Sequence, residues 1–339
     1  MAKILICGGS GHVGALLAAK LQALGHAVAT LAYDQSPALQ RLALLGIPHH
    51  HVDLSGQPDL AKAFEQVELV INLAAKITFK DRDWDSVRPV NVEATRTIVN
   101  ACQRYGVRRL VHFSSIDVFA GHPPHEVVAE HRPLIPLDFP LAYPRSKRVG
   151  QQLVMQAMAA GLDAIIIYPT SILGPGDYYF RSSNRILWMM AQGRMPLLLN
   201  AGLTVVDVRD VVDFTVKAMW DAPAGATYIL TGPWAHFKDF ADLLAPLTGR
   251  KPLPWLIPFE LLKWIAPLSS RFSEWRGTNS PLTLTALHGT SHYRYVSSAK
   301  AEKEFGFVAR PLAETVCDTW AWMQEQGFLD PKWTLDATI

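Results

Sequence analysis

Short apolar runs alternate with longer amphipathic stretches through the first half of the chain. The apolar runs predict buried strands at Lys3–Cys7, Ala27–Tyr33, His49–Leu54, Leu69–Ala74 and Arg109–Ser114. The amphipathic stretches predict helices that include His12–Leu24, Pro37–Leu45 and Asn91–Tyr105. Helix follows strand at the spacing of right-handed parallel crossovers, which predicts an α/β fold with a doubly wound parallel (Rossmann) sheet.

The regular alternation changes after Pro169. A strand at Asp163–Tyr168 follows a helix that begins near Tyr143, and the pattern returns once, at Thr204–Trp220. We therefore expect residues 1–169 and 204–230 to form a dinucleotide-binding Rossmann domain. Residues 170–203 and 231–330 are expected to form a smaller, discontinuous substrate-binding domain over the carboxyl edge of the sheet, where α/β folds bind ligands.

Charge and composition exclude several classes of partner. The 32 Lys and Arg residues nearly balance the 30 Asp and Glu residues, so no strong field favours nucleic acid or an anionic membrane. The longest apolar stretch outside the strands, Leu253 to Leu268, contains prolines and charges that disfavour a membrane span. It is interpreted instead as a pocket wall or an oligomer contact.

Aromatic residues in the later part of the chain favour an apolar small-molecule substrate. They are Tyr178, Tyr179, Phe180, Trp255, Trp264, Phe272 and Trp275. Nearby Asp177 and Arg181 are expected to be solvated loop charges rather than substrate ligands.

Cysteine and histidine spacing predict neither disulfides nor a metal site. Cys7, Cys102 and Cys317 lie far apart, as buried thiols in a reducing compartment would, and a strand begins too early for a signal peptide. The expected location is the cytoplasm. Consecutive His49, His50 and His51 in a strand point to alternate faces and so cannot chelate one ion together.

A glycine-rich turn joins the first predicted strand to the first helix. Gly8, Gly9, Gly11 and Gly14 fit either a G-x-G-x-x-G or a G-x-x-G-x-x-G spacing. Such a turn lets backbone N–H groups approach a pyrophosphate at the helix N-terminus. The residues expected to bind the dinucleotide here are Gly8, Ser10, Gly11, His12, Val13 and Gly14.

An acid at the end of the second strand favours NAD as the cofactor. Asp34 lies twenty residues after Gly14, where a carboxylate can hold the adenosine ribose hydroxyls. NADP stays possible because Ser36 could accept a 2′-phosphate, and Asp34 could instead cap the helix that begins at Pro37.

A tyrosine and a lysine four residues apart are the candidate acid–base pair. Tyr143 and Lys147 begin a predicted helix with Pro144 in its first turn, so that both side chains rise on one face. We expect the ammonium, helped by the positive charge of an oxidised nicotinamide, to lower the phenol pKa from its ordinary value of about 10. Ser115, at the end of the fifth strand, is the candidate hydroxyl that orients a substrate oxygen; neighbouring Ser114 is the lesser candidate.

Together these segments resemble the extended short-chain dehydrogenase/reductase family, also described as NAD-dependent epimerases/dehydratases. The resemblance rests on the glycine loop, Asn72-Leu73-Ala74-Ala75, Asn91 with Thr95, Phe113-Ser114-Ser115, Tyr143 with Lys147, and Tyr168-Pro169-Thr170-Ser171. Residues 111–118 and 142–147 are most similar to 3β-hydroxysteroid dehydrogenases, and the later part also to dihydroflavonol-reductase-like proteins and hopanoid-associated sugar epimerases.

The resemblance implies roles for particular residues. It implies that Asp53 and Leu54 flank the adenine, and that Ala74 and Ala75 line the cofactor groove. It assigns Ser115, Tyr143 and Lys147 as the catalytic set, with Lys147 also holding the nicotinamide ribose, and it places Pro169 and Ser171 at the nicotinamide end. A homodimer through the helices at 91–105 and 147–160 is a further expectation. Tyr33 stands where many NADP-using relatives carry arginine, and Tyr168 where relatives carry arginine before the proline.

Three functions are compatible with this pattern. The first is an NAD(P)-dependent dehydrogenase or reductase that interconverts an alcohol and a ketone on an apolar, steroid- or lipid-like substrate. The second is a nucleotide-sugar epimerase or dehydratase that retains its NAD. The third is a non-catalytic dinucleotide-sensing protein, which would not need the Tyr143–Lys147 pair.

Overall fold

The computed structural model describes residues 1–33, 37–56, 58–180, 183–195, 198–250, 256–257, 283–291 and 293–330. A seven-stranded sheet dominates it, in the order β10-β6-β5-β4-β1-β2-β3 with parallel neighbours throughout. Its strands are β1 (Lys3–Cys7), β2 (Ala27–Ala32), β3 (His49–His51), β4 (Leu69–Asn72), β5 (Arg109–Phe113), β6 (Ala164–Pro169) and β10 (Thr227–Leu230). This order confirms the predicted doubly wound parallel sheet.

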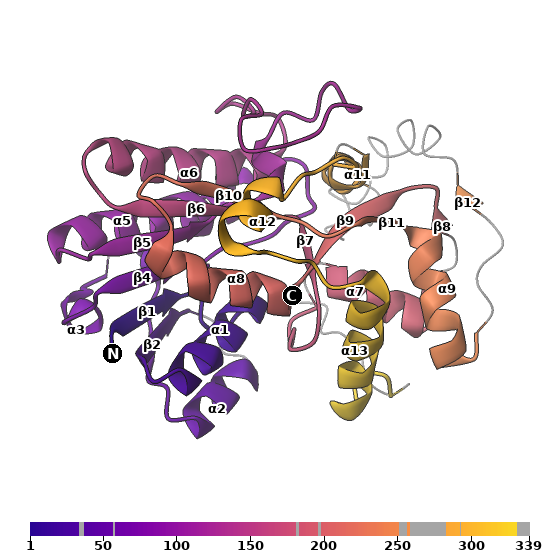
Figure 1. Cartoon of the computed structure of the whole chain (residues 1–339), viewed down its shortest axis with the longest axis horizontal. Coiled ribbons are helices and arrows are strands. Elements are labelled where there is room, and N and C mark those ends of the chain that lie inside the picture. Colours follow the sequence, from indigo (N-terminus) through magenta and orange to yellow (C-terminus); the bar gives the residue numbers. More distant parts are fainter. Residues whose placement is uncertain are drawn as a thin grey trace.

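Helices cover both faces of the large sheet (Figure 1). One face carries α1 (His12–Ala23), α2 (Pro37–Leu44) and α8 (Val208–Asp221). The other carries α3 (Ala61–Phe64), α4 (Trp84–Arg88), the π-helix η2 (Pro89–Glu93), α5 (Ala94–Arg104) and α6 (Ala142–Ala159). Two 3₁₀ turns, η1 (Leu54–Gly56) and η3 (Ile116–Val118), follow β3 and β5. Every residue of β4 and β6 is buried, because parallel strands are covered on both faces.

Two separate apolar clusters fill the two sides of the sheet. Leu17 of α1 and Val211 of α8 pack with Ile4 and Ile71 on one side. Ile98 of α5 packs on the other side with the remaining alternate strand residues. The side with α5 and α6 is the one on which the candidate catalytic residues lie.

A smaller region lies beyond the carboxyl edge of the large sheet (Figure 1). Its three-stranded sheet has the order β11-β9-β7, from β7 (Ser171–Leu173), β9 (Gly202–Asp207) and β11 (Trp234–His236). A two-stranded sheet pairs β8 (Leu198–Leu199) with β12 (Leu256–Ile257). The helices α7 (Ser183–Ala191), α9 (Phe237–Thr248), α11 (Leu284–Ser291), α12 (Ala299–Phe305) and α13 (Leu312–Glu325) complete the described chain.

The observed elements cross the expected domain boundaries at two points. The boundary expected at 204 falls inside β9, which pairs with β7 and β11 rather than with the large sheet. Near the C-terminus, Ala301 and Phe307 belong to the core cluster of α1 and α8, although 231–330 was expected to form the second domain. The chain returns to the large sheet there because Phe305 packs edge-on against Phe214 and Tyr228.

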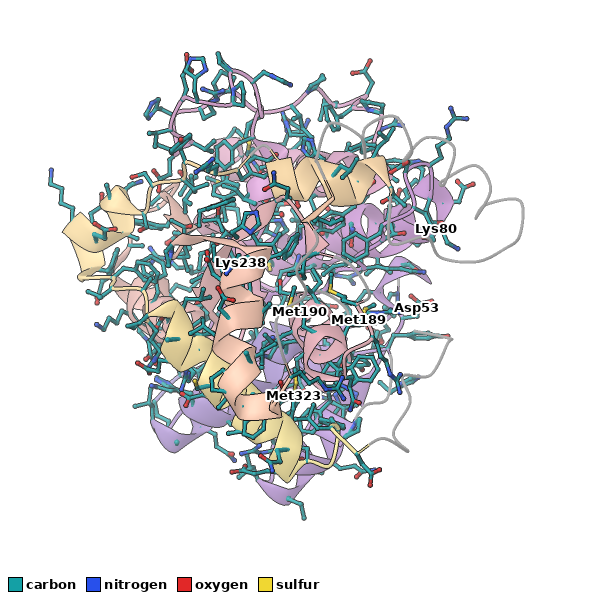
Figure 2. The ribbon with its side chains drawn as sticks, turned by 90° about the vertical axis from the view of Figure 1, so that its right-hand side faces the viewer. Asp53, Lys80, Met189, Met190, Lys238 and Met323 are labelled. Atoms are coloured by element: carbon teal, nitrogen blue, oxygen red, sulfur yellow. The ribbon has the colours of Figure 1, made fainter. Side chains whose placement is uncertain are left out.

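The aromatic residues near position 180 form the core of the smaller region. Phe180 is 1% exposed, and its ring contacts Trp188, Trp322 and Phe328. In Figure 2, Met189 and Met190 of α7 are labelled near the middle of this view, with Met323 of α13 below them.

Two expectations about single side chains need correction. Asp177 is 6% exposed rather than solvated, because its carboxylate accepts hydrogen bonds from the backbone of Tyr179 and Phe180 and from Asn184. Cys317 is exposed, whereas Cys7 and Cys102 are buried. Arg181, Trp255, Trp264, Phe272 and Trp275 lie outside the described residues.

Candidate active site

The glycine loop lies between β1 and α1, at the centre of the large sheet. The strand order continues from β4 towards β10 on one side and from β1 towards β3 on the other. The crevice between the carboxyl ends of β1 and β4 is therefore the switch point where such folds bind nucleotides. Gly8 has φ +87°, and a Cβ there would lie 2.8 Å from the backbone nitrogen of Ala74. A side chain at this position would therefore be strained and would strike the end of β4.

The start of α1 is suited to a pyrophosphate. Gly11 is its N-cap and has no side chain, so the first-turn N–H groups of α1 are not capped by that residue. A Cβ at Gly14 would lie 2.3 Å from the carbonyl oxygen of Gly8, which shows how closely the helix packs on the turn. N–H groups without a side-chain cap at the positive end of a helix fit the phosphates of a dinucleotide.

The other predicted cofactor residues follow the ends of neighbouring strands. Ala74 donates its N–H to Asn72 Oδ1 at 3.1 Å just after β4, while Pro169 ends β6 and Ser171 begins β7. Asp53 follows β3 and holds both the hydroxyl and the N–H of Ser55, and these hydrogen bonds lower the pKa of its carboxyl. It lies at the surface in Figure 2.

Leu54, beside Asp53, is buried, and Ala75 follows Ala74. Asp34, the predicted ribose ligand, lies outside the described residues. His12 makes a contact that the sequence did not predict. Its Nε2 lies 3.0 Å from the carbonyl oxygen of Pro175 and links the glycine loop to the later half of the chain.

The candidate catalytic side chains converge where β5 ends and α6 begins. Ser115 is the N-cap of η3, and its hydroxyl accepts the N–H of Asp117. Tyr143 and Lys147 occupy the first two turns of α6, and the Tyr143 phenol has a side-chain hydrogen bond with Ser115. Lys147 Nζ donates to the carbonyl oxygen of Phe113 at 2.7 Å, so α6 is fixed to the end of β5.

The expected lowering of the Tyr143 pKa by Lys147 is not what the structure shows. Burial raises the pKa of the phenol, the carboxylate of Asp117 raises it further, and only Ser115 opposes them. The ammonium of Lys147 instead faces the Phe113 carbonyl. Tyr143 is consequently held as a neutral phenol, which is a proton donor.

Lys147 is itself destabilised in its charged form. Its side chain is buried, and burial lowers its pKa to about 8. On the paired strands β4 and β5, the Asn72 side chain donates to His112 Nδ1 at 3.2 Å. Burial, followed by the charge of Lys147, lowers the pKa of His112, which stays a neutral strand residue.

Asn91 supports the candidate site through contacts that the sequence did not predict. Its side chain accepts the N–H of Lys76 at 2.7 Å and donates to the carbonyl oxygen of the same residue at 2.9 Å. It also donates to Ser146 Oγ at 2.8 Å, and Ser146 donates to the carbonyl oxygen of Tyr143 at 2.7 Å. Asn91 therefore connects the segment after β4 to the first turn of α6.

Ser114 has a different partner from Ser115. It is buried and donates to Gln151 Oε1 of α6 at 2.7 Å. In the described part of the chain, no group of three His, Cys, Asp or Glu side chains could hold a metal ion. Nor is any described helix both long and apolar enough for a membrane crossing.

Known proteins resemble this chain over nearly its whole length. Sterol demethylase protein B of Methylococcus capsulatus is 30% identical over 330 residues, which cover 96% of this chain and 99% of the relative. The decarboxylating sterol-4-alpha-carboxylate 3-dehydrogenase of Saccharomyces cerevisiae is 25% identical, over 95% of this chain and 98% of its own.

A solved structure shares the fold at lower identity. UDP-glucuronic acid 4-epimerase from Bacillus cereus, in complex with UDP-glucuronic acid and NAD, aligns with a TM-score of 0.76 and 16% identity. The alignment covers 96% of this chain and 99% of the epimerase chain.

The family model for the NAD dependent epimerase/dehydratase family matches residues 4–230, which include the glycine loop, Ser115, Tyr143 and Lys147. This match confirms the resemblance to extended short-chain dehydrogenases/reductases and the expected cofactor, NAD. The chain belongs to the NAD-dependent epimerase/dehydratase family.

Proposed function

We propose that this protein is an NAD-linked dehydrogenase or reductase that interconverts an alcohol and a ketone on an apolar, sterol- or lipid-like substrate. The observation that carries the proposal is the convergence of the Ser115 and Tyr143 hydroxyls at the carboxyl end of β5, with Lys147 buried beside them. The two sterol-modifying relatives support the substrate class.

In this proposal each residue has one task. Ser115 donates a hydrogen bond that orients the substrate oxygen, and Tyr143 gives its phenolic proton to that oxygen as a ketone is reduced. Lys147 holds α6 against β5, and in this proposal it also binds the nicotinamide ribose. Bound NADH supplies the hydride, and the glycine loop from Gly8 to Gly14 holds its pyrophosphate.

The smaller region is proposed as the substrate-binding domain. Its packed core around Phe180, Trp188 and Met190 holds it beyond the carboxyl edge of the large sheet, where α/β folds bind ligands. A sugar-nucleotide substrate is the second candidate, because the Bacillus cereus epimerase has the same fold.

The two candidates differ in what happens to the cofactor. A reductase consumes added NADH in proportion to the ketone reduced, whereas an epimerase retains its NAD and shows no net turnover of it. We would follow NADH absorbance with a panel of 3-keto steroids, long-chain ketones and UDP-sugars, using wild type and Tyr143→Phe.

We expect turnover with apolar ketones and a loss of about 10² to 10⁴ in kcat/KM for Tyr143→Phe. Binding of NADH, measured by its fluorescence, should be retained in the variant. Isomerisation of a UDP-sugar without net NADH consumption would support the second candidate instead. If NADH binds but neither reaction occurs, the non-catalytic function gains support.

A further inference from the structure

The carboxyl group of Asp117 lies beside the two candidate catalytic hydroxyls. Ser115 Oγ is 3.0 Å from Asp117 Oδ2, and the backbone N–H of Asp117 donates to the same Oγ at 3.3 Å. The turn η3 fixes this arrangement, because Ser115 is its N-cap and Asp117 lies in its first turn. Sequence alone gave no reason to single out Asp117.

The carboxyl group has no counter-ion in the described part of the chain. None of the Lys, Arg or His side chains there forms an ion pair with it. The titratable groups influenced by its charge are two phenols: Tyr143 of α6, and Tyr293 from the segment between α11 and α12.

Two basic side chains on the elements that carry these phenols have other partners. Lys147 donates to the Phe113 carbonyl, and His288 of α11 lies 3.0 Å from the hydroxyl of Tyr293. A carboxylate placed between phenols, without a cation, gains little from its charge.

Resting on the proposed function, we propose that Asp117 is a positioning residue that must carry a proton for Ser115 to act on the substrate. Protonated Asp117 donates its O–H to Ser115 Oγ, so the serine proton is free to point at the substrate oxygen. Ionised Asp117 instead accepts the serine proton, and Ser115 then has none to offer.

Ionised Asp117 would also slow the reaction through its negative charge. An anion near a substrate oxygen that gains negative charge in the transition state disfavours that state. Burial raises the pKa of Asp117 to about 6, with the hydrogen bond from Ser115 opposing the shift. The change between the two arrangements is therefore expected near pH 6.

The first test does not depend on turnover. The side-chain carboxyl carbons of aspartate are labelled with ¹³C, and the pH titration is followed by NMR in wild type, Asp117→Asn and Ser115→Ala. The Asp117 signal is the one missing from Asp117→Asn. We expect its midpoint near pH 6, and a higher midpoint in Ser115→Ala because the variant loses a hydrogen bond that favours the charged form.

The second test is the pH profile of kcat/KM for ketone reduction. Above the pKa, wild-type activity should fall towards a tenfold loss per pH unit. Asp117→Asn, whose amide can still donate to Ser115 without becoming charged, should lack this limb and exceed wild type at pH 8. The control Asp221→Asn changes an exposed aspartate on α8 and should keep the wild-type profile.

Three outcomes would overturn the proposal. They are an Asp117 midpoint near pH 4, a falling limb near pH 6 that persists in Asp117→Asn, and an equal loss of activity by Asp117→Asn at every pH. If wild type reduces no ketone, the proposed function fails, while the NMR titration still decides which protonation state Asp117 adopts.

Discussion

At the scale of single residues, the environment of each group sets its chemistry more than its type does. Tyr143 and Lys147 both lie in α6, and loss of contact with water favours the neutral form of each. For the phenol this keeps the proton that a reductase must donate. For the ammonium it has a cost in stability, because a buried charge replaces a solvated one.

The cost predicts that Lys147→Met stabilises the protein while removing activity. Below pH 8 the lysine is protonated in both the folded and the unfolded state, so the full penalty is present at pH 7. The unfolded chain keeps its proton to about pH 10, so wild-type stability should rise between pH 8 and 10. We expect a gain of about 1–2 kcal/mol in the free energy of unfolding at pH 7.

Urea unfolding at pH 7 and pH 10 measures this effect. The difference between Lys147→Met and wild type should shrink at the higher pH. Lys62→Met, at an exposed position of α3, is the control and should change little at either pH. A less stable Lys147→Met at pH 7, or a difference that does not depend on pH, would contradict the account.

The residue-scale chemistry was predictable only in part. The spacing of Tyr143 and Lys147 on one helix face follows from the 3.6-residue period, so the structure and the sequence agree there. The direction of the Tyr143 pKa shift and the neighbourhood of Asp117 depend on burial and on Tyr293, which is distant in sequence. No local pattern encodes those contacts.

At the scale of secondary-structure elements, the close approach of α6 to η2 positions the acid–base pair. A Cβ on Gly150 of α6 would lie 2.3 Å from the carbonyl oxygen of Asn91. The same Asn91 holds the first turn of α6 through Ser146. Sequence predicted one helix from Asn91 to Tyr105, but the structure has the π-helix η2 at Pro89–Glu93 and then α5. The π-turn contains Asn91 itself, and its contacts are tertiary, so helical periodicity could not reveal them.

This packing predicts that Gly150→Ala impairs both stability and catalysis. The added methyl group must push α6 away from η2, which should lower the free energy of unfolding by about 1–3 kcal/mol. Tyr143 and Lys147 move with the helix, so kcat/KM should fall by about 10².

Gly56→Ala is the matched control for this variant. A Cβ there has no atom within 4 Å and needs no unusual backbone angle. Chemical denaturation and ketone-reduction kinetics on both variants provide the measurement. Equal behaviour of Gly150→Ala and Gly56→Ala would show that the approach of α6 to η2 is not needed for the site.

At the scale of the whole molecule, α5 and α6 lie next to each other on one side of the large sheet (Figure 1). We predict that these helices form the contact of a homodimer. Met155 of α6 is 38% exposed and would be buried in that contact. Light scattering of the wild type should therefore give twice the chain mass.

Met155→Glu should shift the protein towards the monomer. Leu44→Glu changes an apolar residue of α2 that is 89% exposed. The strand that follows α2 is β3, at one end of the sheet, whereas the strand that follows α6 is β6, near the other end. This variant should therefore leave the mass unchanged. A wild-type monomer, or an equal effect of the two variants, would refute this interface.

The overall topology was more predictable than the smaller region. Alternating apolar and amphipathic runs define a parallel sheet almost by themselves, because such strands are buried on both faces. The position of β9 in the smaller sheet, and the return of Ala301 and Phe307 to the large core, depend on long-range packing. Those features have no periodic signal in the sequence.

The most direct measurement of the central claim is transfer of the label from NADH that carries deuterium at both C4 positions to an apolar ketone. We predict that the wild type forms the alcohol with one deuterium on the carbinol carbon, detected by mass spectrometry, and that Tyr143→Phe binds NADH but transfers almost none. Alcohol formed without the label, or undiminished transfer by Tyr143→Phe, would contradict the assignment of this site as the place of hydride and proton transfer.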